Sequence, residues 1–305
     1  MVMLGTSEQE IDSIINSLKS DSTVGWDSIP TKVLKMAKNI LTVPLTHIVN
    51  LCIEKGVFPK VFKKSIIHPI FKAGDRNCVG NYRPISVLTS LSKVLEKIVN
   101  KRLVTYLEDK HILSNNQFGF RQGKSTEQAV SELVNFVAKH VDNKDKCLGV
   151  FLDLAKAFDT VSVPILVNKL EAIGIRGIAL KLFKDYLSDR TQKVTIGGYF
   201  SKEIPITYGV PQGSVLGPKL FLVYINNLCN LELDKSKIFS YADDTAIIFY
   251  AKTWEETKST AELGLHKISN WPIVNLTCPR YPLRSANEAL ATDRWRYNHR
   301  KKAGL

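Results

Sequence analysis

Two adjacent aspartates, Asp243 and Asp244, separate two stretches of β-forming residues, and this pattern limits the local fold to a hairpin. Residues 237–242 and 245–250 are rich in branched and aromatic side chains, as strands are. Aspartate tolerates the backbone of a tight turn. Neighbouring carboxylates repel each other unless a cation lies close to them. The pattern predicts a hairpin whose turn carries a cation site, and the alternative is an ordinary surface turn.

The charge and cysteine content restrict the partners and the compartment of the chain. Its 305 residues are enough for two subdomains, and its net charge of +13 favours nucleic acid or an anionic membrane surface over charge that serves solubility alone. The five cysteines are scattered, which argues against a zinc site or a disulfide framework and fits a reducing compartment. No apolar run approaches the roughly 18 residues of a membrane span, and no signal-peptide pattern is present. An intracellular protein of the nucleus or cytoplasm, without a membrane partner, is expected.

Helical periodicity dominates the first 60 residues. Ser7 precedes the first apolar helical pattern and is followed three residues later by Glu10, which is typical of a helix N-cap. A second helical pattern covers 31–54, and Pro44 is expected to interrupt it because proline removes a backbone donor and clashes with the preceding turn.

An extended stretch over 61–85 precedes a long helical pattern from 87 to 106. Lys93, Lys97 and Lys101 recur every four residues along this helix and therefore share one face. That face could follow the phosphates of a nucleic acid, but such a row is more often a solvated helix surface. Both interpretations stay open from the sequence alone.

Strand and helix patterns alternate irregularly in the rest of the chain, which indicates an α+β fold. The expected features are a helix opening near Ser125, a helical stretch broken at Gly174 and Gly177, a hairpin at Gly197-Gly198 and a helix over 216–228.

Asp153 is the expected partner of the Asp243-Asp244 pair. It lies inside the apolar strand pattern 148–154, and a charge within a buried strand is costly unless it is paired or bound to a metal. The alternative is a structural aspartate that caps the next helix, a role that suits Asp159 better.

Five ordered motifs resemble those of reverse transcriptases from non-LTR retrotransposons of the Jockey-like type. The three palm motifs are similar to Phe151-Leu-Asp-Leu-Ala-Lys-Ala-Phe-Asp, Tyr208-Gly-Val-Pro-Gln-Gly-Ser-Val-Leu-Gly-Pro and Tyr241-Ala-Asp-Asp. Asn81-Tyr-Arg-Pro-Ile-Ser and Gln117-Phe-Gly-Phe-Arg-Gln-Gly-Lys-Ser-Thr resemble the finger motifs, and Gly25-Trp-Asp-Ser-Ile-Pro resembles the segment before the fingers. The resemblance covers residues 8–271 and implies an RNA-directed DNA polymerase domain, hence a nucleotidyltransferase of a transposable element.

The resemblance also implies roles for particular residues. Asp153, Asp243 and Asp244 would be catalytic and would hold two Mg²⁺ ions, for which Mn²⁺ can substitute. The implied nucleotide-binding residues are Lys72, Arg83, Phe158, Gln212 and Gly213, with Phe158 as a steric gate against the ribose 2′-hydroxyl. Arg121 would contact the template. Without the resemblance, Phe158 is a plain core residue and each cation is an ordinary surface charge.

The implied architecture is a polymerase right hand. Residues 1–60 would form a helical N-terminal extension, 61–145 the fingers and 146–271 the palm, with the thumb missing. The implied partners are an RNA template, a DNA primer and deoxynucleoside triphosphates.

The likeness ends after Trp271. Residues 272–305 lack periodicity and carry a basic excess, so they are expected to form a disordered tail. The family's primer-binding hairpin and helical thumb are not matched there. The alternative function is therefore a catalytically inactive, truncated remnant that still binds nucleic acid through its basic surface.

Overall fold

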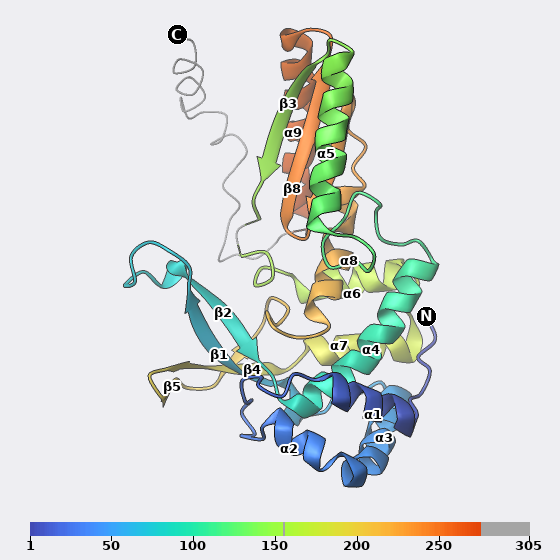
Figure 1. The fold of residues 1–305 in the computed structure, drawn as a ribbon, viewed down its shortest axis with the longest axis vertical. Coiled ribbons are helices and arrows are strands. Elements are labelled where there is room, and N and C mark those ends of the chain that lie inside the picture. Colours follow the sequence, from blue (N-terminus) through green and yellow to red (C-terminus); the bar gives the residue numbers. More distant parts are fainter. Residues whose placement is uncertain (155, 276–305) are drawn as a thin grey trace. The chain divides into compact units, whose positions relative to one another are not determined.

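The computed structural model describes residues 1–154 and 156–275 of the chain (Figure 1). The fold is a mixture of helices and strands divided into two compact units. The first unit joins Met1–Ser114 to Lys156–Asn226, and the second joins 115–155 to the described residues from 227 onward. The N-terminal extension, fingers and palm remain sequence-based assignments.

Helices form most of the first unit. They are α1 (Glu8–Ser17), α2 (Thr31–Met36), α3 (Lys38–Lys55), α4 (Ser90–Asp109), α6 (Val163–Ala172), α7 (Gly177–Leu187) and most of α8 (Gly217–Cys229), with short 3₁₀ turns at Lys60–Lys63 and Val79–Asn81. Residues 220–226 of α8 are all buried. A helix that is apolar on every side belongs in an interior, and α8 is therefore a central element of this core.

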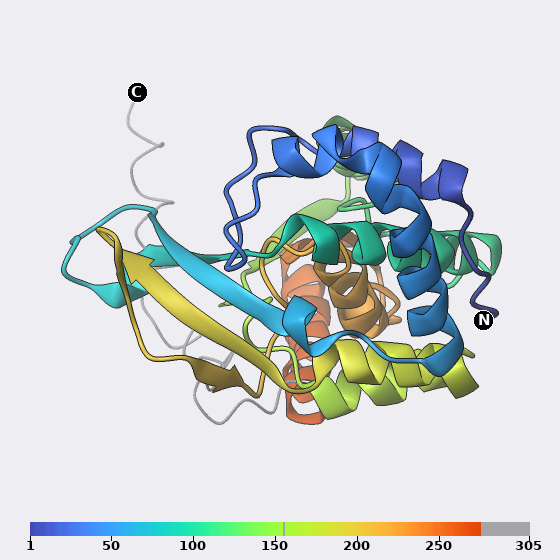
Figure 2. The same ribbon diagram turned by 90° about the horizontal axis from the view of Figure 1, so that it is seen from below.

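The first unit also contains a five-stranded sheet, seen beside its helices in Figure 2. Its strands are β1 (Lys64–Phe71), β2 (Tyr82–Val87), β4 (Arg190–Ile196), β5 (Tyr199–Phe200) and β6 (Ile204–Ile206). The order is β2-β1-β4-β5, and β6 also pairs with β4. The β1–β4 pair is parallel and the others are antiparallel.

The second unit is an antiparallel sheet between two helices (Figure 1). Strands β3 (Lys146–Leu152), β8 (Asp244–Ala251) and β7 (Ser236–Tyr241) lie in that order, with α5 (Thr126–Asp142) and α9 (Trp254–Asn275). Ile248 joins a core cluster with residues of α5, whereas the ring of Phe249 packs against Gly264 of α9. Successive strand residues point to opposite faces, so α5 and α9 cover the two faces of this sheet.

Most of the helix caps, breaks and turns predicted from short sequence patterns are confirmed. The Ser7 hydroxyl accepts a hydrogen bond from the Glu10 amide at 3.3 Å, and Ser125 caps α5 in the same way through Gln128. Gly174 lies in the break between α6 and α7 and Gly177 is the first residue of α7, and both have positive φ. The predicted hairpin at Gly197-Gly198 is the β4–β5 connection, where both glycines also have positive φ.

The expected interruption at Pro44 is wrong. Helix α3 runs through Pro44, and the chain breaks instead at Ala37, between α2 and α3. Leu45 and Val49 follow the proline and are buried, so core packing of this face outweighs the roughly 3 kcal/mol that an internal proline costs.

Residues 272–275 of the expected tail are described by the structure. Helix α9 continues through Pro272 to Asn275, so the first residues of the expected tail are helical. The remainder, 276–305, lies outside the described residues.

The lysine row on α4 ties this helix to α1. The ammonium group of Lys97 donates to the Ser17 hydroxyl at 2.7 Å, and that of Lys101 lies 2.9 Å from the Glu10 carboxylate. Lys93 is half-buried, and its burial lowers its pKa. Two of the three lysines therefore also contact α1, although Lys101 stays exposed as the solvated-surface interpretation expects.

Glu10 is the anchor of this helix contact. Its carboxylate accepts hydrogen bonds from Nη1 and Nη2 of Arg102, both at 2.6 Å. The Glu10 side chain is 16% exposed, and the Arg102 hydrogen bonds are the main reason why its pKa falls from 4.5 to about 2. A two-pronged guanidinium–carboxylate pair of this kind adds both orientation and energy to the α1–α4 packing.

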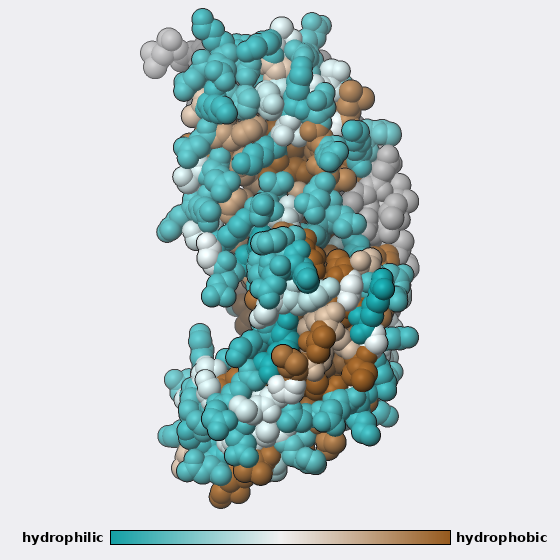
Figure 3. Space-filling view, turned by 90° about the vertical axis from the view of Figure 1, so that its right-hand side faces the viewer, coloured by the Kyte–Doolittle hydropathy of each residue, from teal (hydrophilic) through white to brown (hydrophobic). Residues whose placement is uncertain are grey.

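Apolar side chains remain exposed on α2 and α3. Val33, Met36, Ile40 and Val43 are at least half exposed. Figure 3 shows hydrophobic side chains on the surface at the lower end of the molecule, where Figure 1 places these helices. In the part of the chain that the structure describes, no helix combines the length and apolar character needed to cross a bilayer.

We predict that Arg102→Met lowers the free energy of unfolding by about 2 kcal/mol at pH 7, because the Glu10 carboxylate loses two charge-assisted hydrogen bonds. The folded-state pKa of Glu10 is depressed, so this contribution is complete above about pH 4.5 and is lost as the pH falls toward about 2. Urea denaturation at a series of pH values measures both effects.

Lys101→Met is the matched control. The Lys101 side chain is 67% exposed and binds the same carboxylate, so its loss should cost at most about 1 kcal/mol. Equal destabilisation by both variants, or a cost for Arg102→Met that does not change between pH 7 and pH 3, would contradict the assignment.

Candidate functional site

The aspartate hairpin connects β7 and β8 in the second unit. Tyr241 pairs with Asp244, so the loop between the strands consists of Ala242 and Asp243. Ala242 is buried at φ 57, a left-handed conformation that costs a non-glycine residue roughly 1–2 kcal/mol. Asp243 is partly exposed in the turn, and Asp244 is exposed as the first residue of β8. The predicted hairpin is confirmed.

Asp153 lies one residue beyond the end of β3 and is exposed, so its placement inside a buried strand is wrong. The strand ends at Leu152, which pairs with Thr245, the last matched pair of the β3–β8 ladder. The next register position on each strand is Asp153 on one and Asp244 on the other. Antiparallel pairing thus brings Asp153, Asp243 and Asp244 to one end of the sheet.

The expected helix cap at Asp159 is also wrong, because the N-cap of α6 is Ser162.

This sheet edge suits a hard divalent cation. The donors are carboxylate oxygens on solvent-accessible positions. Within the described residues, no three or more Asp, Glu, His or Cys side chains are already gathered around a common metal position. Mg²⁺ is typically held by one or two carboxylates together with water and substrate phosphates rather than by a cage of protein ligands. The donor set therefore fits Mg²⁺, with part of the shell left for a substrate.

Two cations lie on the β1–β2 hairpin of the first unit. Arg83 is exposed on β2 and pairs with Ile70. Lys72 is exposed just beyond β1, where its amide donates to the Asn81 carbonyl at 2.9 Å. Side chains two positions apart along a strand share a face, so Lys72 and Arg83 are diagonal neighbours on one face of the hairpin.

Phe158 belongs to the same unit and has a fixed ring. It stacks on Phe221 of α8 with 4.6 Å between ring centroids and 21° between ring planes. Its neighbour Asp159 has a pKa raised by burial, an effect that the charges of Lys156 and Lys72 oppose. This electrostatic contact associates Lys72 with the Phe158 turn.

The loop with Gln212 and Gly213 rests on the end of β2. The carbonyl of Gln212 accepts from the Ser86 amide at 2.7 Å. Gly213 has φ 119, and a Cβ there would lie 2.5 Å from the Ser86 carbonyl oxygen, so this position requires glycine. Among the described residues, the buried Oε1 of Gln212 has no hydrogen-bond partner, so it is an acceptor still available to a ligand.

The structure groups the predicted residues by unit. Asp153, Asp243, Asp244 and the half-buried Arg121 belong to the second unit. The first unit holds Lys72, Arg83, Phe158, Gln212 and Gly213.

Sequence reasoning missed the buried charges behind the Gln212 loop. Glu96 of α4 is fully buried, and its carboxylate accepts from the amides of Val215 at 2.7 Å and Leu216 at 3.2 Å, just before α8. Burial raises the pKa of Glu96, and the nearby charge of Arg190 opposes the rise. Arg190 is 1% exposed, and its Nη1 donates to the Tyr186 carbonyl at 3.0 Å. The available signal was a glutamate on the apolar face of α4, beside Leu95.

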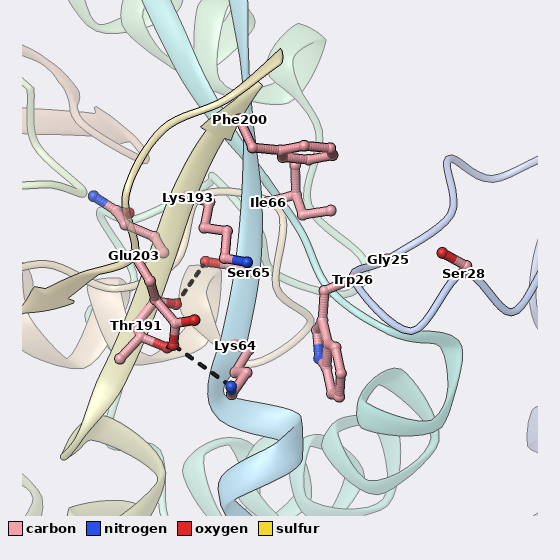
Figure 4. Close-up of a pocket in the computed structure, with 11 residues that line it drawn as sticks. Gly25, Trp26, Ser28, Lys64, Ser65, Ile66, Thr191, Lys193, Phe200 and Glu203 are labelled. Atoms are coloured by element: carbon pink, nitrogen blue, oxygen red, sulfur yellow. Dashed lines mark hydrogen bonds and ion pairs between the residues drawn. The ribbon is translucent and has the colours of Figure 1, made fainter. Parts of the chain in front are cut away.

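A separate hollow of about 280 Å³ lies beside Trp26 in the first unit (Figure 4). Figure 4 shows Lys64 between Trp26 and Glu203. The Lys64 ammonium lies 3.6 Å from the Glu203 carboxylate, and the indole N–H of Trp26 donates to the Val61 carbonyl. None of the predicted site residues lines this hollow. The Ser65 hydroxyl donates to the Thr191 carbonyl, and Glu203 contacts both Thr191 and Lys64, so these groups support the junction of β1 with β4.

Comparisons with known proteins agree on one family. The family model described as reverse transcriptase (RNA-dependent DNA polymerase) matches residues 63–271. The chain is 32% identical over 270 residues to the RNA-directed DNA polymerase from mobile element jockey of Drosophila melanogaster, covering 86% of this chain and 29% of that protein. It is also 32% identical over 283 residues to the probable RNA-directed DNA polymerase from transposon BS of the same species, covering 90% and 30%.

The chain thus spans about 30% of the length of these curated relatives. Among solved structures, a truncated apo telomerase from Candida tropicalis matches 69% of this chain and 47% of its own, with 14% identity and a TM-score of 0.47. This structural likeness is too weak to support an inference.

We predict that Glu96→Leu lowers the free energy of unfolding by about 3 kcal/mol, because it leaves two loop amides without an acceptor and removes a negative charge that acts on the buried Arg190. Glu96→Gln should cost less, since an amide oxygen still accepts from the Val215 amide. Urea denaturation measures both.

The exposed Glu54 on α3 provides the matched control, and Glu54→Gln should change stability by no more than about 0.5 kcal/mol. If Glu96→Leu were as stable as wild type, the loop would not depend on this carboxylate.

Proposed function

The chain belongs to the reverse transcriptase (RNA-dependent DNA polymerase) family, and on that premise we propose that it adds deoxynucleotides to the 3′ end of a DNA primer on an RNA template. The observation that carries the proposal is the β3–β8 register, which brings Asp153 beside Asp244 at the sheet edge where the hairpin presents Asp243. Transfer of a nucleotide develops negative charge on phosphate oxygens, and a carboxylate-bound metal pair is suited to balance it.

Reverse transcriptases generally use divalent metal ions. We assign Asp153, Asp243 and Asp244 as the residues that hold two Mg²⁺ ions, or Mn²⁺ in their place. When bound, these ions supply the positive charge that lowers the pKa of the primer 3′-hydroxyl and offsets the charge of the triphosphate. The solvent-accessible carboxylates provide oxygen ligands while leaving coordination positions for the substrate.

Lys72 and Arg83 are proposed to bind the triphosphate. Their positions as diagonal neighbours on one face of the β1–β2 hairpin support this role, because a triphosphate presents several oxygens to more than one cation. Arg121 is proposed to contact the template strand through its phosphates, which gives affinity without reading sequence.

Phe158, Gln212 and Gly213 are proposed to surround the incoming nucleotide. The stacking of Phe158 on Phe221 would hold the ring in one orientation, which a steric gate requires. At Gly213 the absence of a side chain permits close backbone approach, and the Gln212 Oε1 atom offers a buried acceptor.

The proposed activity also gives the parts of the chain their names. Residues 1–60 would be the N-terminal extension, 61–145 the fingers and 146–271 the palm of a polymerase right hand. RNA templates, DNA primers and deoxynucleoside triphosphates meet in the nucleus and cytoplasm, where we place the protein.

Primer extension on an RNA template tests the proposal. We expect the 305-residue chain to extend a DNA primer with Mg²⁺, and Asp243→Asn to reduce the rate at least about 100-fold, because losing a metal-binding carboxylate removes several kcal/mol of charge stabilisation. Asp142→Asn, on the exposed end of α5, should leave the rate unchanged.

Equal incorporation by wild type and Asp243→Asn would contradict the proposal. Salt-sensitive RNA binding without incorporation by either protein would instead support a nucleic-acid-binding remnant.

The steric gate generates its own prediction. Phe158→Ala should raise ribonucleotide incorporation relative to deoxynucleotide incorporation at least about tenfold, which corresponds to about 1.4 kcal/mol of lost discrimination. Phe200→Ala, which removes an exposed ring from β5, is the control and should leave the ratio unchanged. An unchanged ratio in Phe158→Ala would show that another residue excludes the 2′-hydroxyl.

A further inference from the structure

A buried amide side chain holds the turn that carries Asp243. Gln117 is 1% exposed, and its Oε1 atom accepts from the amides of Gly119 at 2.8 Å and Ala242 at 2.9 Å. Its Nε2 group donates to the carbonyl of Ala242 at 3.3 Å. One glutamine therefore binds both the N–H and the C=O of Ala242, as an amide with donor and acceptor can.

The backbone around Gln117 forms an additional support for the hairpin. Gln117 makes an isolated parallel bridge with Ser240 of β7. The Phe118 amide donates to the Ser240 carbonyl, and the Ser240 amide donates to the Asn116 carbonyl, both at 2.8 Å. This segment therefore acts as a short fourth strand along β7, directly beside the turn.

The segment and the turn approach each other too closely for a side chain at position 119. A Cβ placed on Gly119 would lie 2.2 Å from the Ala242 nitrogen. Such a distance is far below any real carbon–nitrogen contact, so Gly119 permits the approach that lets Gln117 reach the turn. Phe118 fills the core under α5, which anchors the segment independently of the Gln117 side chain.

The clamped residue is the strained one. Ala242 has φ 57, a conformation that an alanine leaves readily unless its surroundings impose it. Asp243 is the next residue and Asp244 follows. Fixing the two peptide groups of Ala242 therefore sets the direction in which the chain presents both carboxylates.

We propose that Gln117 is a positioning residue for the metal-binding carboxylates: its side-chain amide holds Ala242 in the left-handed conformation that aims Asp243 and Asp244. The inference rests on the proposed function for its consequence in catalysis. Its structural content, that the turn depends on Gln117, stands apart from that function.

Gln117→Met tests the inference, because methionine fills a similar volume and makes none of the three hydrogen bonds. In Mg²⁺ titrations of primer extension, this variant should need about tenfold more Mg²⁺ for half-maximal rate. A tenfold change corresponds in free energy to the net contribution of one to two hydrogen bonds. Gln117→Asn is a second variant that keeps the amide but is one methylene too short to reach Ala242.

Adding Ala242→Gly to Gln117→Met separates positioning from general damage. Glycine adopts positive φ without strain, so it should restore part of the lost Mg²⁺ affinity if the clamp serves to hold that conformation. Thr257→Val is the matched control. Thr257 is fully buried in the same unit, and its hydroxyl donates to the Lys146 carbonyl at the opposite end of β3.

Amide hydrogen exchange provides a readout that does not depend on activity. Exchange across 240–245 should accelerate about tenfold in Gln117→Met and stay at the wild-type rate in Thr257→Val. Unchanged exchange in Gln117→Met and Gln117→Asn, or an unchanged Mg²⁺ requirement in active enzyme, would overturn the inference. Faster exchange in a chain whose wild type extends no primer would support the clamp while rejecting the proposed function.

Discussion

The register between β3 and β8 is the constraint on which the carboxylate edge depends. Ile248 faces the core under α5, and Phe249 faces α9. A slip of one residue would exchange these two side chains between the faces and would also move Asp244 away from the position beside Asp153. The apolar alternation of β8 therefore fixes where the carboxylates lie. The packing of apolar side chains against the two faces of the sheet therefore also stabilises the arrangement of the three aspartates.

In the first unit, a buried carboxylate orders the loop with Gln212 and Gly213. Glu96 reaches the amides that precede α8, and Arg190 balances its charge inside the core. Leaving the two loop amides without the Glu96 acceptor would be costly, so this contact favours one loop arrangement over others. That arrangement seats Gln212 and Gly213 on Ser86. The alternation of apolar residues in β8 positions the three aspartates, whereas the buried Glu96 carboxylate positions the loop with Gln212 and Gly213.

The sequence predicted what local chemistry decides. The hairpin at Asp243, the cap at Ser7 and the break between Gly174 and Gly177 depend on residues within a few positions of one another, and all three are confirmed. Features that depend on distant partners were missed or wrong. Asp153 falls outside its strand because the β8 pairing ends at Leu152, and Pro44 is tolerated because of what α3 packs against.

At Ala242, local backbone conformation and a contact with a distant segment act together. A glycine would adopt φ 57 without strain, but it would also leave the turn free to adopt other conformations. Alanine restricts that freedom at a cost of roughly 1–2 kcal/mol, which the hydrogen bonds from Gln117 can offset. The result is a turn with one preferred conformation, held from a segment more than a hundred residues earlier in the chain. In the proposed function Asp243 and Asp244 share metal ions, and that role needs this kind of fixed geometry, because a small displacement of one ligand weakens the whole site.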